Sequence, residues 1–323
     1  MFSLQFNLKF IEFLVDHRNP FLTDFFLSFT ALGAFDVYIL IVTLIYVAWD
    51  KQLAIRLSVL VLLTSSLNAV LKLIIKNPRP FVREGTYLKK WIVPAQDANQ
   101  LAMEYSTPSG HAMSASAFYS YLYKLSGNKY FRAFAVVAIL LIGLSRPYLG
   151  VHFFEDVLLG WAIGLVCALA YFRYLPRVGE MWNALSYSQQ IGIALAASLA
   201  LWLLSVAVNG GHTDGQPLES LTRTGFLTGI VVARPLELRA VNFDPRSSTA
   251  ADRTLRFLLT ISLVIGTMLS LNMAFRGASS PLALPGIILQ FLRPAAAAFM
   301  GIFIAPWLFT KMGLAKTLPA RAI

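Results

Sequence analysis

The segment SRPYLGVHFFED, residues 145–156, places an arginine, a histidine and two acids between two long apolar runs. Charged groups at the end of a membrane helix are costly and usually functional. His152 and Asp156 are four residues apart, so a helix that begins near Val151 would present both on one face. An aspartate that accepts a hydrogen bond from one imidazole nitrogen leaves the other nitrogen free to attack. Arg146 suits phosphate oxygens, although a salt bridge that seals the helix end explains this segment equally well.

The composition indicates an integral membrane protein. The chain has 323 residues, of which 57% are hydrophobic and 13% charged, whereas soluble proteins have about 25% charged residues. The apolar residues fall in long blocks, as expected of membrane spans. The net charge is +11, but the basic residues lie in short clusters between apolar runs, which is typical of membrane loops and argues against nucleic-acid binding. The single cysteine, Cys167, excludes a disulfide framework and a cysteine metal cluster.

The apolar blocks predict a short interfacial helix followed by about nine spans. The interfacial helix covers residues 2–15 and is no cleavable signal, because charged residues interrupt it. The predicted spans are 22–49, with a gentle break at Gly33, then 53–75, 108–123, 131–144, 151–171, 191–208, 226–238, 255–275 and 287–309. The span at 226–238 is short and contains Arg234, so it either crosses the membrane or is re-entrant. The best linkers are 174–188 and 239–253.

The pattern therefore predicts an all-α polytopic membrane fold, with a core over residues 1–178 and an accessory region over residues 179–323, which ends with about three additional C-terminal transmembrane helices. Lys and Arg are more frequent on one side of the predicted topology once the suspected site residues are set aside. Because basic loops stay in the cytoplasm, we expect the C-terminus inside. The N-terminus and the suspected site are then expected on the extracytoplasmic side of the plasma (inner) membrane.

Two further polar clusters are expected at the same side of the membrane. Lys72 and Arg79 lie where Pro78 ends the second span. The segment 107–111, TPSGH, opens the third span, where free backbone N–H groups can bind an anion. Each cluster alone has an ordinary structural role, either as cations that reach the headgroups or as a helix cap. Three such clusters at one depth favour a shared anion site.

Together these segments resemble the signature motifs of the type 2 phosphatidic acid phosphatase superfamily. Lys72 precedes Arg79 by six intervening residues, residues 108–111 read PSGH, and Ser145-Arg146 is followed by His152 and Asp156 at the family's spacing. The resemblance covers about residues 60–170. It implies a six-helix membrane core and a phosphatase that needs no metal or other cofactor and acts through a phosphohistidine.

The resemblance also implies roles for eight residues. His152 would be the nucleophile, Asp156 its orienting partner and His111 the general acid. The phosphoryl oxygens would be held by Lys72, Arg79, Ser109, Gly110 and Arg146. These roles agree with the chemistry of phosphoryl transfer, in which catalysis is mostly electrostatic stabilisation and in-line positioning.

A metal site is the competing interpretation of the same side chains. His111, His152 and Asp156 could form a two-histidine, one-carboxylate set, but the neighbouring Lys72, Arg79 and Arg146 would repel a dication. Vanadium haloperoxidases share the resemblance, but they are soluble proteins, and the predicted spans argue against that assignment. We therefore expect no metal.

The sequence is less specific about the substrate. A lipid phosphate or a polyprenyl diphosphate, with its tail in the bilayer, suits a site at the membrane surface. Glu104-Tyr105 resembles the sphingoid-base phosphate phosphatases, and residues 108–113 resemble glucose-6-phosphatase, which acts on a soluble ester. A headgroup could be contacted by the loop residues Arg83, Lys89, Lys90, Trp91 and Tyr105.

Other functions remain open at this point: a lipid-to-lipid phosphotransferase, or a non-catalytic lipid-binding or transport protein. The expected partners are the bilayer and an amphiphilic phosphate, with no nucleic acid. Gly225 and Gly229 have small-residue spacing that favours helix packing, either within the chain or in a homo-oligomer. The region after residue 178 adds structural bulk or shapes a groove through which lipid reaches the site.

Overall fold

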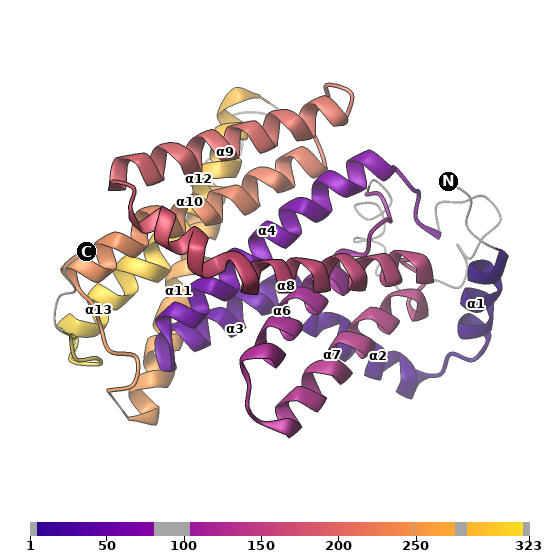
Figure 1. The fold of residues 1–323 in the computed structure, drawn as a ribbon, viewed down its shortest axis with the longest axis horizontal. Helices are drawn as coiled ribbons and strands as arrows, with labels where there is room; N and C mark the ends of the chain where they lie inside the picture. The colour runs from indigo at the N-terminus through magenta and orange to yellow at the C-terminus, as the bar shows by residue number, and fades with distance from the viewer. Residues whose placement is uncertain (1–4, 81–103, 248, 275–282, 319–323) are drawn as a thin grey trace. The chain divides into compact units, whose positions relative to one another are not determined.

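The computed structural model describes residues 5–80, 104–247, 249–274 and 283–318, and every regular element in these ranges is helical (Figure 1). Within these ranges, six helices are long and apolar enough to cross a membrane, or seven if one bent pair is counted as a span. The predicted all-α polytopic membrane fold is therefore confirmed. Of the loop residues expected at headgroups, only Tyr105 lies within the described ranges.

The chain divides into two compact units that do not follow a single cut in the sequence. The first unit contains Met1–Tyr38 and Leu63–Arg177, and the second contains Ile39–Leu62 and Val178–Ile323. Helix α4 (Lys51–Ile75) contributes its first half to the second unit and its last half to the first. The division of function between residues 1–178 and 179–323 stays a prediction.

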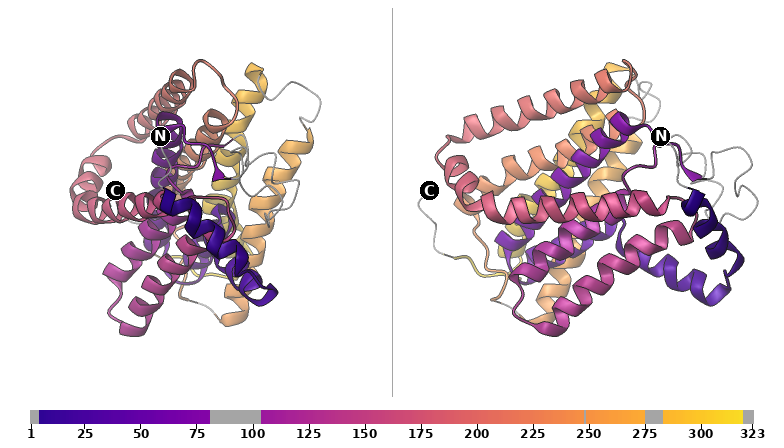
Figure 2. Two further views of the ribbon diagram at one scale, coloured as in Figure 1. Left: turned by 90° about the vertical axis from the view of Figure 1, so that its right-hand side faces the viewer. Right: turned by 45° about the vertical axis from the view of Figure 1, so that its right-hand side comes forward.

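The first unit consists mainly of helices that surround the suspected site residues. Its helices besides α4 are α1 (Gln5–Asp16), α2 (Pro20–Leu32), α6 (Gly110–Leu125), α7 (Lys129–Tyr148) and α8 (Phe154–Asn183). Helices α6 and α7 pack side by side, as both views in Figure 2 show. Only three residues join them, and the side chain of Asn128 caps α7 by accepting hydrogen bonds from two backbone N–H groups. Short connections of this kind produce antiparallel neighbours.

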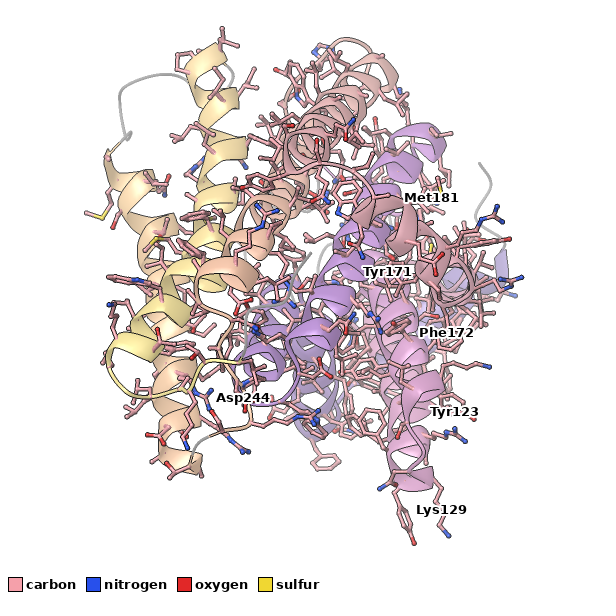
Figure 3. All side chains as sticks on the ribbon, turned by 60° about the vertical axis from the view of Figure 1, so that its left-hand side comes forward. Tyr123, Lys129, Tyr171, Phe172, Met181 and Asp244 are labelled. Atoms are coloured by element: carbon pink, nitrogen blue, oxygen red, sulfur yellow. The ribbon has the colours of Figure 1, made fainter. Side chains whose placement is uncertain are left out.

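Aromatic and basic side chains cluster at the end of the unit where α6 and α7 are joined. In Figure 3, Tyr123 and Lys129 project from this end. Tyr123 is 41% exposed, and the guanidinium carbon of Arg132 lies 5.3 Å from the centre of its ring. Such residues are typical of the interface between membrane and water.

The predicted first span is wrong in one respect: it is broken sharply at Gly33. Helix α2 and helix α3 (Phe35–Ala48) meet at 58°, rather than in the gentle bend expected. A Cβ atom at Gly33 would lie 2.5 Å from Ile142 and 3.1 Å from the Cδ2 atom of His111. The bend therefore occurs where the backbone must approach α7 and a suspected site histidine.

The C-terminal end of α7 and the N-terminal end of α8 differ from the predicted spans. Helix α7 extends to Tyr148 rather than ending at residue 144, and α8 begins at Phe154 rather than near Val151. Helix α8 also continues to Asn183, through part of the predicted linker at 174–188. The predicted span ended too early because a charged residue such as Arg146 normally marks the end of a membrane helix. In the structure Arg146 is buried, and the helix continues past it.

Two glycines allow α8 to pack closely on α6. A Cβ atom at Gly160 would lie 2.8 Å from the carbonyl oxygen of Ser109, and one at Gly164 would lie 2.2 Å from that of Met113. Residues of this size at a spacing of four let helix backbones approach. This contact fixes the start of α6, and thus the PSGH segment, against α8.

The second unit contains most of α3, the first half of α4, the last residues of α8 and all of the remaining helices. The remaining helices are α9 (Tyr187–Val208), α10 (Gln216–Ala240), α11 (Ala250–Ala274), α12 (Leu284–Phe299), the π-helical turn η2 (Met300–Ile304) and α13 (Ala305–Lys311). The predicted short span at 226–238 is part of α10, which has 25 residues and packs against α9 and α12. A Cβ atom at Gly225 or Gly229 would lie 2.3 or 2.4 Å from a backbone oxygen of α12, which confirms the predicted packing face.

A buried ion-pair network holds the second unit together. The Lys51 ammonium lies 2.7 Å from the Glu237 carboxylate, and Arg234 lies 2.6 Å from the other oxygen of the same carboxylate. Lys51 also donates to Asn242 at 3.1 Å. Because both cations contact the one carboxylate, these side chains connect α4 to α10 and leave Glu237 no free oxygen for another ion.

Candidate active site

The three predicted clusters meet in the first unit. An Nη1 of Arg79 lies 3.2 Å from the Nε2 of His152 and donates to the carbonyl of Val151 at 3.2 Å. The backbone N–H of Ser109 donates to the carbonyl of Asp156 at 3.0 Å. Segments that are far apart in the sequence are thus brought within hydrogen-bond distance.

His152 lies in the connection between α7 and α8, not on the first turn of a helix. Its Nδ1 is 3.5 Å from the Asp156 carboxylate, too far for a good direct hydrogen bond, and 3.2 Å from the Ser106 hydroxyl. Ser106 in turn donates to Asp156 at 2.5 Å. The predicted aspartate–histidine pair is therefore present, but a serine hydroxyl lies between its members.

The protonation of His152 follows from its surroundings. Burial, together with the nearby cations of Arg79, Arg146 and Lys72, holds the pKa of His152 well below its ordinary value, so the imidazole is neutral at pH 7. A guanidinium can only donate, so the Nε2 that faces Arg79 must be the acceptor. The proton is then on Nδ1, which faces Ser106 and Asp156. With the proton on Nδ1, the free electron pair of His152 is on Nε2, next to the guanidinium of Arg79.

Asp156 accepts several hydrogen bonds that sequence reasoning did not find. Besides Ser106, the hydroxyl of Thr107 and the backbone N–H of Phe153 donate to it, the latter at 2.8 Å. Asn77 donates to Thr107 at 2.9 Å. Ser106 and Thr107 directly precede the PSGH segment, but a serine and a threonine in a loop carry no distinguishing signal of their own.

Glu104 is the second feature that the sequence did not predict. One oxygen of its carboxylate lies 2.7 Å from Nη2 of Arg79 and 3.3 Å from the ammonium of Lys72. Burial alone would raise the pKa of Glu104, but the charges and hydrogen bonds of Lys72 and Arg79 outweigh burial and lower it. An ionised carboxylate therefore contacts the two cations that were expected to hold a phosphate.

Arg146 is buried near the end of α7 and does not face lipid. One Nη donates to the hydroxyl of Thr30, while Nε has no hydrogen-bond partner among the described residues. A buried guanidinium N–H without an acceptor costs about 1–3 kcal/mol. Donation from Nε to an oxygen of an anion would recover this cost.

The PSGH segment forms the N-terminus of α6. The Ser109 hydroxyl caps the helix by accepting from Ala112, so this serine has the capping role that its position allows. Gly110 lies next to Asn68, whose amide donates to the carbonyl of Pro108 at 3.0 Å. His111, on the first turn, lies within electrostatic range of Arg146, His152, Arg79 and Lys72. All eight predicted residues thus belong to one region of the first unit.

Known protein families match the sequence of this chain in the same region. Residues 53–180 match the PAP2 superfamily, and residues 221–317 match the transmembrane extension of PAP2 superfamily phosphatases. The chain contains a PAP2 superfamily domain. All eight predicted site residues lie within the first match. The PAP2 domain therefore contains the whole candidate site.

Curated relatives of this chain match part of its length. It is 27% identical over 190 residues to lipid phosphate phosphatase delta of Arabidopsis thaliana, covering 53% of this chain and 45% of that protein. It is 37% identical over 91 residues to phosphatidylglycerophosphatase B of Bacillus subtilis, covering 24% of this chain and 45% of that protein. Mouse sphingosine-1-phosphate phosphatase 2 is 33% identical over 161 residues, covering 48% and 43%. The chain thus spans less than half the length of these relatives.

Proposed function

We propose that this protein is an integral membrane phosphatase that hydrolyses a lipid phosphate or a polyprenyl diphosphate through a phosphohistidine on His152. The observation that supports it most directly is the neutral imidazole of His152, whose unprotonated Nε2 lies 3.2 Å from Arg79. Lys72 and Arg146 supply two more cations in the same region. A nucleophile surrounded by cations suits an anionic electrophile.

In the first step, the phosphate exchanges with the Glu104 carboxylate. The carboxylate bridges Lys72 and Arg79, and a phosphate monoester carries a comparable or greater negative charge with three terminal oxygens. A phosphate can therefore take over both contacts and also accept from the Nε of Arg146. The backbone N–H groups at the start of α6 add to this binding.

In the chemical steps, Nε2 of His152 forms a bond to phosphorus while the bond to the leaving oxygen breaks. His111 takes up a proton as the anionic phosphate binds beside it and then gives this proton to that oxygen. The positive charge that develops on the His152 ring is stabilised by Asp156, through Nδ1–H and the Ser106 hydroxyl. Water then attacks the phosphorus, His111 takes a proton from the water, and the bond between nitrogen and phosphorus breaks to release phosphate. No residue of the protein is consumed.

The substrate class is supported by the membrane setting and the relatives. Names of the relatives specify a lipid phosphate, a phosphatidylglycerophosphate and a sphingoid-base phosphate. A site at the ends of membrane helices lets an amphiphile keep its tail in the bilayer while its phosphate is hydrolysed. We propose that this occurs on the extracytoplasmic side of the plasma (inner) membrane.

The test is phosphate release by the purified protein from a panel that contains phosphatidic acid, sphingosine-1-phosphate, undecaprenyl diphosphate and glucose 6-phosphate, with a chelator present. We expect release from one or more of the lipids, and none from the His152→Ala variant. His212→Ala, at an exposed position in the second unit, should retain full activity.

Three outcomes contradict the proposal. Transfer of phosphate only to a second lipid would identify a phosphotransferase. Release only from glucose 6-phosphate would identify a soluble-ester phosphatase. Lipid binding without turnover by the wild-type protein would identify a non-catalytic lipid-binding or transport protein.

A further inference from the structure

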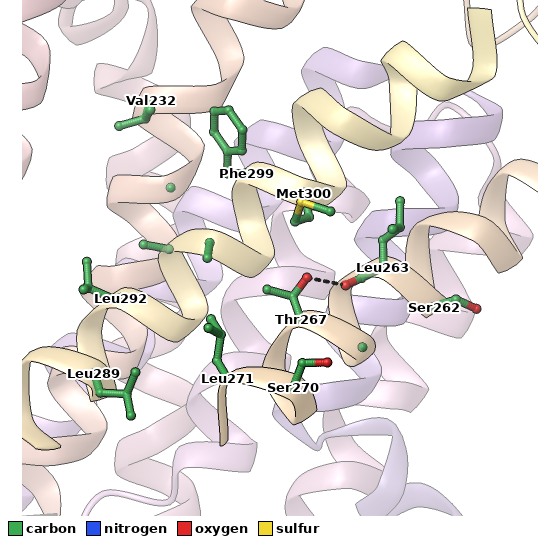
Figure 4. A pocket seen from close by; sticks show the side chains of 14 residues that line it. Val232, Ser262, Leu263, Thr267, Ser270, Leu271, Leu289, Leu292, Phe299 and Met300 are labelled. Carbon is green, nitrogen blue, oxygen red and sulfur yellow. Dashed lines mark hydrogen bonds between the residues drawn. The ribbon is translucent and has the colours of Figure 1, made fainter. Parts of the chain in front are cut away.

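A groove in the second unit lies between α10, α11, α12 and the turn η2 (Figure 4). Its volume is about 870 Å³, and its walls include Val232, Leu263, Leu271, Leu292, Phe299 and Met300. The hydroxyl of Thr267, which also lines it, is already committed to the carbonyl of Leu263 at 2.7 Å (Figure 4). The other polar side chains in the lining are the small hydroxyls of Ser262 and Ser270, so the groove suits a ligand segment that is mainly apolar.

Hydrogen-bonded polar side chains lie beside lining residues of the groove. Arg293 of α12 donates to Asn272 of α11 at 2.9 Å and also to Gln290. Gln290 donates to Thr222 of α10 at 2.9 Å. These hydrogen bonds connect the three helices that form the groove. They lie next in sequence to the lining residues Leu289 and Leu271.

The positive charge of Arg293 is not neutralised by an acidic side chain in the described ranges. In the described residues Arg293 contacts only neutral groups. The sequence has no Asp or Glu after Asp252, so α12 and most of α11 provide no carboxylate. Glu219, on α10, is paired with Arg223 at 2.6 Å. A cation beside an apolar groove complements a ligand with an anionic head and a hydrocarbon tail.

The position of Arg293 along its helix is consistent with contact to a lipid headgroup. The continuous helix Leu284–Lys311 has 28 residues, so it is about 42 Å long and exceeds the ~30 Å hydrocarbon layer. Arg293 lies nine residues from the first residue of this helix, or about 13 Å along it. Its long side chain can reach the phosphate level from there.

We propose that this groove binds one acyl chain of an anionic phospholipid, whose phosphate is held by Arg293. The site lies in the second unit, contains none of the predicted catalytic residues, and does not depend on the proposed phosphatase activity. A diester such as phosphatidylglycerol is a suitable probe, because a phosphomonoester hydrolase does not consume it.

The test is native mass spectrometry of the full-length protein in detergent, titrated with phosphatidylglycerol or with phosphatidylcholine of the same acyl chains. Orthovanadate is present to occupy the candidate active site. We expect the wild type to hold one phosphatidylglycerol at least about tenfold more tightly than phosphatidylcholine, a difference of about 1.4 kcal/mol. Arg293→Gln should lose this preference.

Filling the groove should block both lipids. A Cβ atom at Gly266, a lining residue, meets nothing within 4 Å, so Gly266→Leu places its side chain in the groove without a clash at Cβ. The matched control is Gly192→Leu on α9, where a Cβ atom also meets nothing within 4 Å. Ser270→Phe, from an exposed lining position, is a second filling variant if Gly266→Leu does not fold.

Several results would overturn the proposal. They are equal binding of the two lipids by the wild type, an unchanged preference in Arg293→Gln, or equal lipid binding by the filled variant and the Gly192→Leu control. A dimer mass that disappears only in the filled variants would show that a second copy of the chain, rather than a lipid, occupies the groove.

Discussion

At the residue scale, we expect Glu104 to be the side chain that most constrains the proposed phosphate binding. Its carboxylate holds Lys72 and Arg79 in place and keeps two cations from repelling each other while the site is empty. The same contacts must be given up when a phosphate binds. Glu104 therefore stabilises the ligand-free protein and competes with anions.

Replacing Glu104 with Gln should tighten anion binding. The substitution keeps the size of the side chain but removes the competing charge, so the inhibition constant of orthovanadate should fall about tenfold, equivalent to about 1.4 kcal/mol. The measurement is inhibition of phosphate release. Glu219→Gln, which breaks an ion pair on α10 instead, should leave inhibition unchanged. Weaker inhibition in folded Glu104→Gln protein would mean that the carboxylate assists binding.

The pH profile should report the cations around His152. Because the pKa of His152 is depressed, its neutral form and the activity that requires it are lost only as the pH falls through that lowered pKa. Arg79→Gln removes one of the causes, so the acid limb of kcat/KM for the residual activity should move to higher pH. The same substrate is used for both proteins, which cancels its own ionisation. An unmoved or lowered limb would show that another group controls it.

The motif residues were predictable because their types and spacings are distinctive. Glu104, Ser106 and Thr107 were not assigned, because acidic and hydroxyl side chains in a loop most often face solvent or stabilise turns. Asn68, on α4, and Asn77 were not assigned either, although their side-chain amides donate to Pro108 and Thr107 and so position the segment before α6. Partners of this kind depend on how segments distant in sequence meet.

At the element scale, predicted spans were too short where a helix contains buried polar groups. Helix α7 continues through Arg146, and α10 begins ten residues before the predicted span at 226. Apolar counting treats a charge as the end of a span, but a charge with partners inside the protein does not end a helix. The bend at Gly33 was underestimated for a different reason, since it depends on contact with α7.

The packing of α8 on α6 should be sensitive to one methyl group. Gly160→Ala would place a Cβ atom 2.8 Å from the Ser109 carbonyl oxygen. We expect a loss of about 1–3 kcal/mol in stability and a fall in kcat, because the start of α6 is displaced. Gly179→Ala, on the same helix but with nothing within 4 Å, should be neutral or stabilising. Thermal unfolding and phosphate release are the measurements, and equal behaviour of the two variants would refute the packing argument.

At the scale of the whole molecule, the sequence predicts an all-α membrane protein with about nine spans. The part of the chain that the structure describes has six or seven helices that are long and apolar enough to cross a membrane. Helix α6 accounts for part of the difference. It has 16 residues, and many of its side chains are buried, so it needs little lipid-facing apolar surface. Its burial within the first unit could not be predicted from hydropathy alone.

The orientation in the membrane is testable with single cysteines in a Cys167→Ala background. We expect His212→Cys, between α9 and α10, to react with an impermeant maleimide in intact cells. Gly127→Cys, between α6 and α7, should react only after permeabilisation, because basic residues place that connection in the cytoplasm. The reverse labelling pattern would invert the proposed topology and move the site to the cytoplasmic side.

The central claim is that His152 carries the phosphoryl group during turnover. The most direct measurement is a rapid quench of the purified protein with a lipid phosphate labelled with ³²P, followed by mapping of the labelled peptide. We predict an acid-labile, base-stable label on Nε2 of His152 that forms and decays at rates compatible with turnover and is absent from His152→Ala. Full turnover with no covalent label, or a label on His111 instead, would contradict this claim.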